Sequence, residues 1–319
     1  MGKDLTGNRI GSSLAGPRIL ILGAAGQLGV ELRRSFAASG HIVAHITAVD
    51  RNAGDLANPA QIRALIRSVQ PEIILNAAAY TAVDRAESEP QIAHAINAEG
   101  PRVLAEEALK LNALLVHYST DYVFDGSKSG PWKETDTPNP LSIYGASKLA
   151  GEQAIQSVGG RYLIFRTSWV YGPHGKNFLL TMLRLARERD RLSIVIDQIG
   201  APTTSIELAR ATHAVVTGIL AGRFGAAQDW TSIYHMTCTS STSWFGFAQA
   251  IFARAAALLG DKVPELTPIP TEDFPTPAAR PRNSVLSNEK LHARFGVQLA
   301  SWESALEEVV DCLKNKSSQ

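Results

Sequence analysis

The sequence predicts an α/β fold, with a Rossmann-type doubly wound parallel sheet and a smaller C-terminal α+β lobe for the substrate. Two observations predict it. From Arg18 to about Gly172, short apolar runs alternate with segments of helical spacing. Parallel strands need crossover connections, usually helices, so this alternation predicts a parallel sheet covered on both faces. The first apolar run also leads directly into a glycine-rich turn and a helix.

The first half of the chain supplies the elements of the sheet. Apolar runs predict strands over residues 18–23, 41–46, 71–79, 113–120 and 161–172. Helical spacing predicts helices over 27–40, 58–70, 90–112 and 142–158. Asn58 is a good N-cap for the second helix, and Pro59 suits its first position. The third helix should be interrupted near Gly100–Pro101.

The pattern is weaker in the second half. We expect helices over 177–190, 206–220 and 243–260, a strand that runs into a loop over 192–203, and an irregular proline-rich segment over 263–282. The domain prediction follows from these elements. Residues 1–17 form a disordered extension, 18–172 an NAD(P)-binding domain joined by a later strand near 231–238, 173–230 and 239–313 the substrate lobe, and 314–319 a tail.

Composition excludes several classes of protein. The net charge of +1 argues against a nucleic-acid or anionic-membrane partner. No apolar stretch is long enough to span a bilayer, and the first residues lack the apolar core of a signal peptide. Cys238 and Cys312 are far apart and lack metal spacing, so we expect free thiols and a cytoplasmic protein.

A glycine loop follows the first predicted strand. "GAAGQLG" places Gly23, Gly26 and Gly29 at the turn and at the start of the next helix. The first glycine allows the tight turn, the second lets a pyrophosphate approach the backbone, and the third lets helix and strand pack closely. This position after a strand predicts a dinucleotide site.

The second strand should decide which dinucleotide binds. If the strand ends at Ile46, it offers no acidic residue for the ribose. If it continues further, Asp50 is the candidate, and Arg51 could meet a 2′-phosphate. The sequence therefore favours NADPH, with NADH tolerated.

Tyr144 and Lys148 lie four residues apart in "SIYGASKLAGE" and share one face of the predicted helix. Thr120 ends a buried strand at the edge where the glycine loop also lies. A phenol has a pKa of about 10, and a nearby cation lowers it. Our interpretation is that Tyr144 donates a proton to a ketone, Lys148 tunes its pKa and binds the nicotinamide ribose, and Thr120 orients the carbonyl. The small residues between them would leave room for the ligands.

Eight strings occur in order: "GAAGQLG", "NAAAYTAVDRAESEP", "HYSTDYVFDG", "YGASKLAGE", "IFRTSWVYG", "NFLLTMLRLA", "DQIGAPT" and "PTPAARPRNSVL". Together they resemble the extended short-chain dehydrogenase/reductase superfamily, and within it the dTDP-4-dehydrorhamnose reductase family, from Arg18 to Leu313. The resemblance implies that NADPH or NADH reduces the C4 ketone of dTDP-4-dehydro-β-L-rhamnose. It also implies a place in dTDP-rhamnose synthesis for cell-surface polysaccharide.

The resemblance also implies roles for individual residues. The catalytic residues would be Thr120, Tyr144 and Lys148. Cofactor binding would involve Gly23, Gly26, Gln27, Leu28, Asp55, Leu56, Ala77, Ala78, Ala79, Tyr80, Thr81, Tyr118 and Lys148. Substrate binding would involve Thr120, Asp121, Tyr144, Trp169, Asn177, Arg280 and Arg282. The two arginines suit a diphosphate, because the guanidinium fork binds phosphate oxygens in pairs.

The chain departs from the family pattern at two places. Ala279 replaces a second arginine in the last string, so a diphosphate would rely on Arg280 and Arg282. Some relatives dimerise around Mg²⁺ held by glutamates. Only Glu31 matches such a position, because Ile206 and Cys312 occupy the other two. The sequence leaves open both a homodimer and a role for Mg²⁺.

Two other functions remain open. A nucleotide-sugar 4,6-dehydratase or 4-epimerase would share the fold, but such dehydratases carry an acidic pair after the threonine, and here Tyr122 follows Asp121. A non-catalytic regulatory subunit of methionine adenosyltransferase would bind NADP and a partner enzyme without turnover. The presence of Thr120, Tyr144 and Lys148 together favours catalysis.

Overall fold

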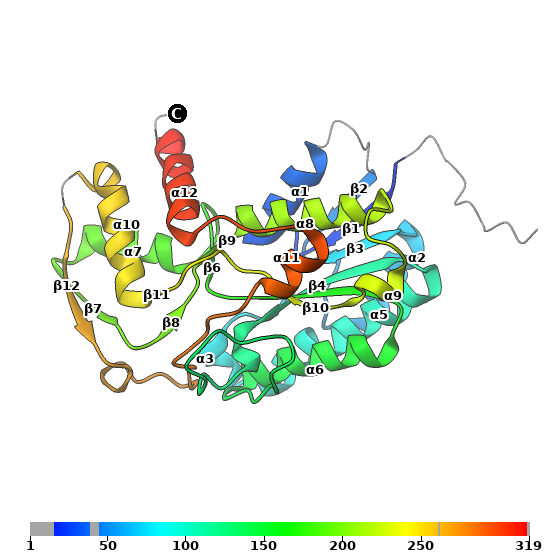
Figure 1. Cartoon of the computed structure of the whole chain (residues 1–319), viewed down its shortest axis with the longest axis horizontal. Helices are drawn as coiled ribbons and strands as arrows, with labels where there is room; N and C mark the ends of the chain where they lie inside the picture. Colours follow the sequence, from blue (N-terminus) through cyan, green and yellow to red (C-terminus); the bar gives the residue numbers. More distant parts are fainter. Residues whose placement is uncertain (1–15, 39–44, 261, 318–319) are drawn as a thin grey trace, which may run out of the picture.

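The computed structural model describes residues 16–38, 45–260 and 262–317. Its centre is a six-stranded parallel sheet in the order β10-β5-β4-β3-β1-β2 (Figure 1). The strands are β1 (Arg18–Leu22), β2 (His45–Val49), β3 (Ile73–Asn76), β4 (Leu114–Thr120), β5 (Arg161–Thr167) and β10 (Ser232–His235). The predicted Rossmann-type sheet is confirmed. The strand order reverses between β1 and β3, which is where such sheets bind ligands.

Helices cover both faces of this sheet. One face packs on α1 (Gln27–Ala37), α8 (Ser205–Leu220), α9 (Ala227–Trp230) and α11 (Glu289–Phe295). The other packs on α2 (Pro59–Val69), α5 (Gly100–Leu111) and α6 (Ile143–Val158). In Figure 1, α1 and α8 lie above the sheet and α5 and α6 below it. Alternate residues of β1 show this division, since Ile19 and Ile21 face the first layer and Leu20 and Leu22 the second.

The smaller lobe has a core of its own, built from α7 (Phe178–Glu188), α10 (Trp244–Leu259) and α12 (Trp302–Ser317). Figure 1 shows it at the left of the sheet. Three short strand pairs complete it. They are β7 (Arg191–Val195) with β12 (Glu265–Ile269), β8 (Ile199–Gly200) with β11 (Thr242–Ser243), and β6 (Val170–Tyr171) with β9 (Thr203–Thr204).

Several sequence predictions need correction. The second strand lies at His45–Val49, later than the predicted 41–46, of which 41–44 fall outside the described residues. The fifth predicted strand breaks after Thr167, because Trp169 has a left-handed backbone with φ of 48°. The proline-rich segment holds β12 and the 3-10 turn η3 (Thr271–Asp273), since β12 pairs with β7.

The helical segment over 90–112 also differs in detail. It consists of α4 (Pro90–His94), a π-helical turn η1 (Ala95–Glu99) and α5, and a short helix α3 (Val83–Ala86) precedes it. The irregular turn therefore comes before Gly100, and Gly100 and Pro101 begin α5. Proline suits a helix start, where its missing N–H has no partner to lose.

The predicted division into domains differs from the packing. Helices α8, α9 and α11, assigned to the substrate lobe by sequence, pack on the main sheet. Residues 314–317, predicted as a tail, continue α12. The predicted extension falls mostly outside the described residues, as does the end of the first helix at 39–40.

One buried ion pair ties α6 to β5. Arg166 on β5 donates to both carboxylate oxygens of Glu152 on α6, at 2.9 and 2.6 Å. Both side chains are almost fully buried. Removing one partner of such a pair leaves a buried charge uncompensated, which is strongly destabilising.

Arg166→Met should therefore lower the free energy of unfolding by about 3–5 kcal/mol, measured by urea denaturation. Arg184→Met is the matched control, because it removes the exposed partner of Glu188 on α7. We expect that control to cost less than about 1 kcal/mol. Equal losses in the two variants would contradict the role given to the buried pair.

Candidate active site

The glycine loop closes tightly between β1 and α1. Gly23 has φ of +76°, in the left-handed region that favours glycine. A Cβ atom on Gly29 would lie 2.1 Å from the carbonyl oxygen of Gly23. Gly26 is the N-cap of α1 and offers no side-chain cap, so the first N–H groups of the helix, at Gln27 and Leu28, are available to an anion. The loop fits a pyrophosphate on these grounds.

The end of β2 carries the residues expected near the adenosine. β2 ends at Val49, so Asp50 follows the strand directly, as the longer of the two sequence alternatives required. Arg51 is exposed and lies 3.5 Å from the Asp55 carboxylate. Leu56 is buried beneath this loop. Asp50, Arg51 and Asp55 thus line one exposed rim beside the sheet.

The segment from Ala77 to Thr81 follows β3 on the other side of the switch point. Its backbone is held by Asn97 of η1, which bonds both the N–H and the carbonyl of Tyr80 at 2.9 and 3.0 Å. The Tyr80 hydroxyl donates to Glu89 at 2.6 Å. The π-helical turn therefore fixes a segment that the sequence assigns to the cofactor.

Asn177 connects the smaller lobe to the glycine loop. Its amide donates to the side-chain oxygen of Gln27 at 2.8 Å and to the carbonyl of Gly172 at 2.9 Å. Its own oxygen accepts from Leu180 N as the N-cap of α7. The structure thus places Asn177 against Gln27, and a substrate contact at Asn177 would compete with these bonds.

Thr120 is the last residue of β4, Asp121 follows it directly, and both are buried. The Thr120 hydroxyl donates to Asp121 Oδ1 at 2.9 Å. Burial raises the pKa of Asp121 to about 6, and hydrogen bonds from Ser284 and Thr120 offset part of the effect. Ser119 and Thr167, on the adjacent ends of β4 and β5, have buried hydroxyls without a protein partner. Unpaired buried polar atoms at one sheet edge are typical of a ligand site.

Tyr144 lies in the first turn of α6, above Thr120. Burial raises the pKa of its phenol to about 12, while a hydrogen bond with Thr120 lowers it in part and the charge of Asp121 raises it further. Its ring packs edge-on against Tyr122, with centroids 5.6 Å apart. The phenol therefore keeps its proton at neutral pH. The structure brings Thr120 and Tyr144 together as the sequence predicted.

Lys148 points inward from the same helix and is 1% exposed. Its amine donates to the Tyr118 carbonyl at 2.6 Å and lies 3.2 Å from His117 Nε2. Burial lowers the pKa of Lys148 to about 8. The amine contacts the Tyr118 carbonyl and His117, while burial, Thr120 and Asp121 shift the pKa of the phenol, so an effect of Lys148 on Tyr144 stays a prediction.

The small residues between Tyr144 and Lys148 serve a different purpose from the one predicted. A Cβ on Gly145 would lie 2.2 Å from the Tyr122 carbonyl oxygen, so the helix packs directly on the backbone after β4. Ala146 is exposed, and the Ser147 hydroxyl bonds Asn97. The interpretation that these residues leave room for ligands was wrong, because Gly145 and Ser147 make close contacts within the protein.

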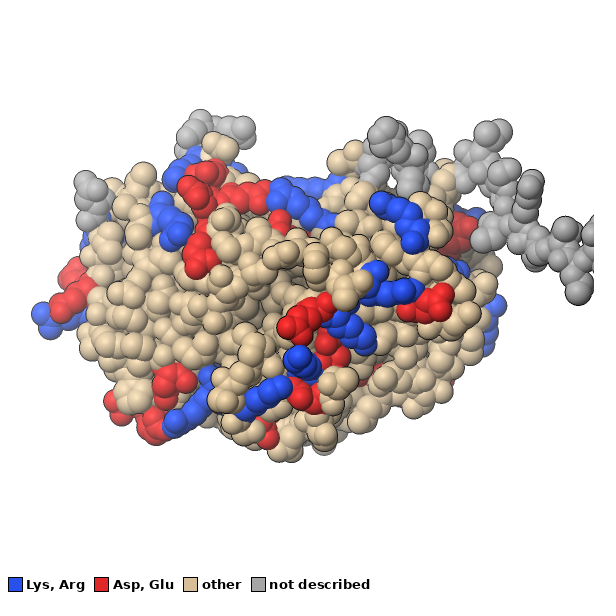
Figure 2. All heavy atoms as spheres, in the orientation of Figure 1, with Lys and Arg blue, Asp and Glu red and all other residues tan. Residues whose placement is uncertain are grey.

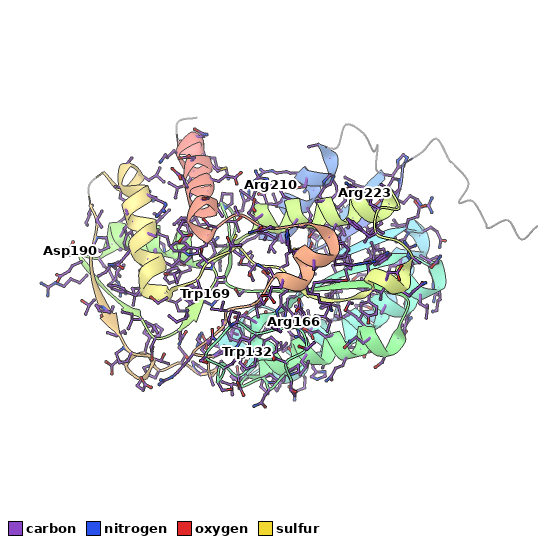
Figure 3. All side chains as sticks on the ribbon, viewed as in Figure 1. Trp132, Arg166, Trp169, Asp190, Arg210 and Arg223 are labelled. Atoms are coloured by element: carbon purple, nitrogen blue, oxygen red, sulfur yellow. The ribbon has the colours of Figure 1, made fainter. Side chains whose placement is uncertain are left out.

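Trp169 lies between β5 and β6, where the sheet meets the smaller lobe (Figure 3). Its ring stacks on Trp244 of α10, with centroids 3.6 Å apart and planes 8° apart. A Cβ on Gly200 would lie 2.5 Å from the Trp169 ring, so only glycine fits there. A left-handed tryptophan is an outlier of the kind that clusters at functional sites.

Arg280 and Arg282 lie in the segment after η3 and are both paired. Arg280 donates to Asp84 at 2.9 Å, and Arg282 donates to Glu272. Arg280 is partly buried, whereas Arg282 is exposed. On the face drawn in Figure 2, basic and acidic residues are interspersed across the surface. A diphosphate at these arginines would have to share or replace their carboxylate partners.

Glu31 does not fit a metal site in this chain. Its carboxylate lies 3.0 Å from both Arg34 Nη1 and His174 Nε2. Among the described residues, no group of three His, Cys, Asp or Glu side chains could hold a metal ion. A carboxylate already neutralised by a guanidinium is a poor ligand for Mg²⁺, so we derive no step from a metal.

Sequence reasoning missed three residues that support the site. Asn76 and His117 lie buried behind Lys148, and Trp244 stacks on Trp169. Asn76 and His117 carried a signal, because each is a polar residue inside an apolar strand. Trp244 carried no such signal in the sequence, since only the packing of α10 brings it against Trp169.

Comparisons with known proteins show the family of the chain. A family model described as the RmlD substrate binding domain matches residues 17–315. The chain belongs to this family. It is 49% identical to a dTDP-4-dehydrorhamnose reductase of Burkholderia thailandensis over 91% of the chain and 96% of the relative. It is 42% identical to that of Escherichia coli K12 over 92% and 97%.

A solved structure of the same family has a similar fold. The dTDP-4-dehydrorhamnose reductase of Bacillus anthracis, crystallised in complex with NADP, superposes with a TM-score of 0.82 at 37% identity. The match covers 92% of this chain and 98% of that one. Among the described parts of the chain, no helix combines the length and apolarity needed to cross a membrane.

Gly29→Ala should disrupt the loop, since the new Cβ would collide with the Gly23 carbonyl. We expect NADPH affinity, measured by nicotinamide fluorescence, to fall by about tenfold or more. Gly130→Ala is the control, because a Cβ there meets no atom within 4 Å. Unchanged affinity in the Gly29 variant would rule the loop out as the pyrophosphate site.

Asp121→Asn should stabilise the protein at neutral pH. Because the Asp121 pKa is raised in the folded state, this carboxyl lowers the free energy of unfolding as pH rises from about 4 to about 6. The variant should gain about 1–3 kcal/mol at pH 7 and lose that part of the pH dependence, measured by urea denaturation at several pH values. A less stable variant at pH 7 would contradict this account.

Proposed function

We propose that this protein reduces the C4 ketone of dTDP-4-dehydro-β-L-rhamnose to give dTDP-β-L-rhamnose, with NADPH as the reductant and NADH tolerated. Two facts carry the proposal together. The chain matches the RmlD family over residues 17–315, and Thr120, Tyr144 and Lys148 gather at the carboxyl edge of the sheet. The relatives at 42–49% identity carry the name of this reductase.

The residues of the chain divide the chemistry. NADPH, when bound, supplies a hydride for the carbonyl carbon. Tyr144 supplies the proton for the carbonyl oxygen, and its high pKa ensures that the proton is present at neutral pH. The Thr120 hydroxyl, beside the phenol, would turn its single hydrogen from Asp121 to the same oxygen, orient it and stabilise its developing negative charge. Lys148, anchored on the Tyr118 carbonyl, offers its remaining hydrogens to the nicotinamide ribose.

The cofactor would lie along the edge already described. Gly23, Gly26, Gln27 and Leu28 hold the pyrophosphate at the start of α1. Asp55, Leu56 and the Ala77–Thr81 segment enclose the adenosine half. Arg51 is exposed at this rim, where its guanidinium could bind a 2′-phosphate, and we prefer NADPH for this reason.

The sugar nucleotide would lie between the sheet and the smaller lobe. Asp121, with an unpartnered Oδ2, and the strained Trp169 face this junction from the ends of β4 and β5. Arg280 and Arg282 bind the diphosphate by giving up carboxylate contacts with Asp84 and Glu272. We also place the reaction in the cytoplasm, and a homodimer remains a prediction that sedimentation can test.

The deciding assay follows NADPH absorbance with purified protein and freshly generated dTDP-4-dehydro-L-rhamnose. Enzyme-dependent loss of the signal, with dTDP-L-rhamnose as product, is the expected result. NADPH binding without oxidation would instead favour the regulatory-subunit alternative. Interconversion of nucleotide sugars with no net redox change would favour an epimerase.

Tyr144→Phe should remove the proton donor but keep the ring. We expect kcat to fall by about 10²-fold or more while NADPH affinity stays within about twofold, since general acid catalysis contributes on this scale. Tyr162→Phe on β5 is the control for a tyrosine outside the site. A Tyr144 variant with normal turnover would eliminate the phenol as the donor.

A further inference from the structure

Three buried polar side chains form a chain behind the active site. Asn76 at the end of β3, His117 on β4 and Lys148 on α6 are each 1% exposed. Asn76 Nδ2 lies 2.9 Å from His117 Nδ1, and His117 Nε2 lies 3.2 Å from the Lys148 amine. Polar groups in such a dry place are costly unless their donors and acceptors match.

The orientation of Asn76 fixes the histidine tautomer. The Ala78 N–H donates to Asn76 Oδ1 at 3.2 Å, so the oxygen of the amide faces Ala78 and its NH₂ faces His117. His117 Nδ1 must therefore accept. A neutral imidazole carries one proton, which then lies on Nε2 and points toward Lys148.

This arrangement opposes the charged form of Lys148. An ammonium has three donors and no acceptor, so it cannot accept the Nε2–H of His117. The neutral amine can accept it and still donate to the Tyr118 carbonyl. The ammonium would need the other histidine tautomer, which would turn the Nδ1 proton toward the amide of Asn76.

Glu152 on α6 is the carboxylate that opposes this effect, because its charge raises the pKa of Lys148. Glu152 is itself bound by Arg166 from β5, and the other ionisable neighbour on α6 is Tyr144. Asp121, at the end of β4, acts on Tyr144. β3 contributes the amide of Asn76, and η1 contributes the amide of Asn97 and the surface carboxylate of Glu99, which Arg102 binds. Burial also favours the uncharged forms of both side chains, since it lowers the pKa of His117 and of Lys148.

We propose that His117 is a positioning residue for Lys148: held by Asn76, it presents an N–H to the lysine amine and lets Lys148 exchange its proton near neutral pH. The proposal deepens the proposed function, because it concerns the residue assigned to the nicotinamide ribose. Ribose oxygens accept hydrogen bonds and favour the ammonium, so NADPH binding takes up a proton at Lys148 when the pH lies above its pKa.

The first test reads the tautomer directly, without turnover. Two-bond ¹⁵N–¹H correlations of histidine-labelled protein, with His117 assigned by its loss in His117→Gln, should show a neutral ring protonated on Nε2 at pH 9 to 10, where Lys148 is mostly the neutral amine. A ring protonated on Nδ1 in that pH range would overturn the proposal.

The second test follows NADPH affinity from pH 6.5 to 10. In the unchanged protein the affinity should fall as the pH rises through about 8, where Lys148 loses its proton. In His117→Gln the amide oxygen can accept from the ammonium, so the fall should move up by about one pH unit. Asn76→Asp should also raise the pH at which the affinity falls. The new carboxylate accepts a hydrogen bond from Nδ1–H of His117, so Nε2 carries no proton and can accept from the Lys148 ammonium.

His235→Gln is the matched control, because His235 is an equally buried histidine on β10 that bonds the Trp132 carbonyl. It should leave the midpoint where it is. The proposal would be overturned if the pH midpoint of NADPH affinity were unchanged in both His117→Gln and Asn76→Asp. If His117→Gln does not fold, Asn76→Asp provides the test. Failure to reduce the keto sugar would reject the proposed function alone, because both tests measure the histidine and NADPH binding.

Discussion

The close approach of α6 to the carboxyl end of β4 is the constraint on which the site depends. Gly145 lets the helix touch the Tyr122 carbonyl, and a Cβ on Gly151 would lie 2.1 Å from the Asn97 carbonyl oxygen. At this separation Lys148 reaches the Tyr118 carbonyl and Tyr144 reaches Thr120. A larger residue at either glycine would move phenol, amine and hydroxyl apart together.

The same closeness makes the site electrostatically unusual. Asp121 and Lys148 are almost fully buried and Tyr144 is partly buried, and burial shifts the pKa of each in the direction that favours its uncharged form. The pKa values of Asp121 and Lys148 move toward neutral pH, so these two groups can exchange protons there, whereas the Tyr144 phenol stays protonated. Such shifts are useful in a reductase and costly for stability. The Arg166–Glu152 pair shows the alternative arrangement, in which two buried charges compensate each other and neither is available for chemistry.

The smaller lobe contributes by holding loops against the sheet. Asn177 caps α7 and at the same time binds Gln27, so the glycine loop and the lobe share one hydrogen-bonded contact. The Trp169–Trp244 stack likewise joins the segment between β5 and β6 to α10. A sugar nucleotide bound at this junction, as proposed, would contact both parts and would compete with the ion pairs of Arg280 with Asp84 and of Arg282 with Glu272.

Much of the protein was determined by the sequence alone. Apolar alternation and helix caps are local, so the sheet, its covering helices and the Asn58 cap could be predicted from neighbouring residues. The glycine loop and the Tyr144–Lys148 pair were also readable, because their spacing fixes their placement on a turn and on a helix face. The tertiary structure alone decided what surrounds them. His117 lies behind Lys148, Trp244 lies on Trp169, and Gly145 lies against a backbone carbonyl because segments far apart in the chain pack together, and no local pattern encodes such contacts.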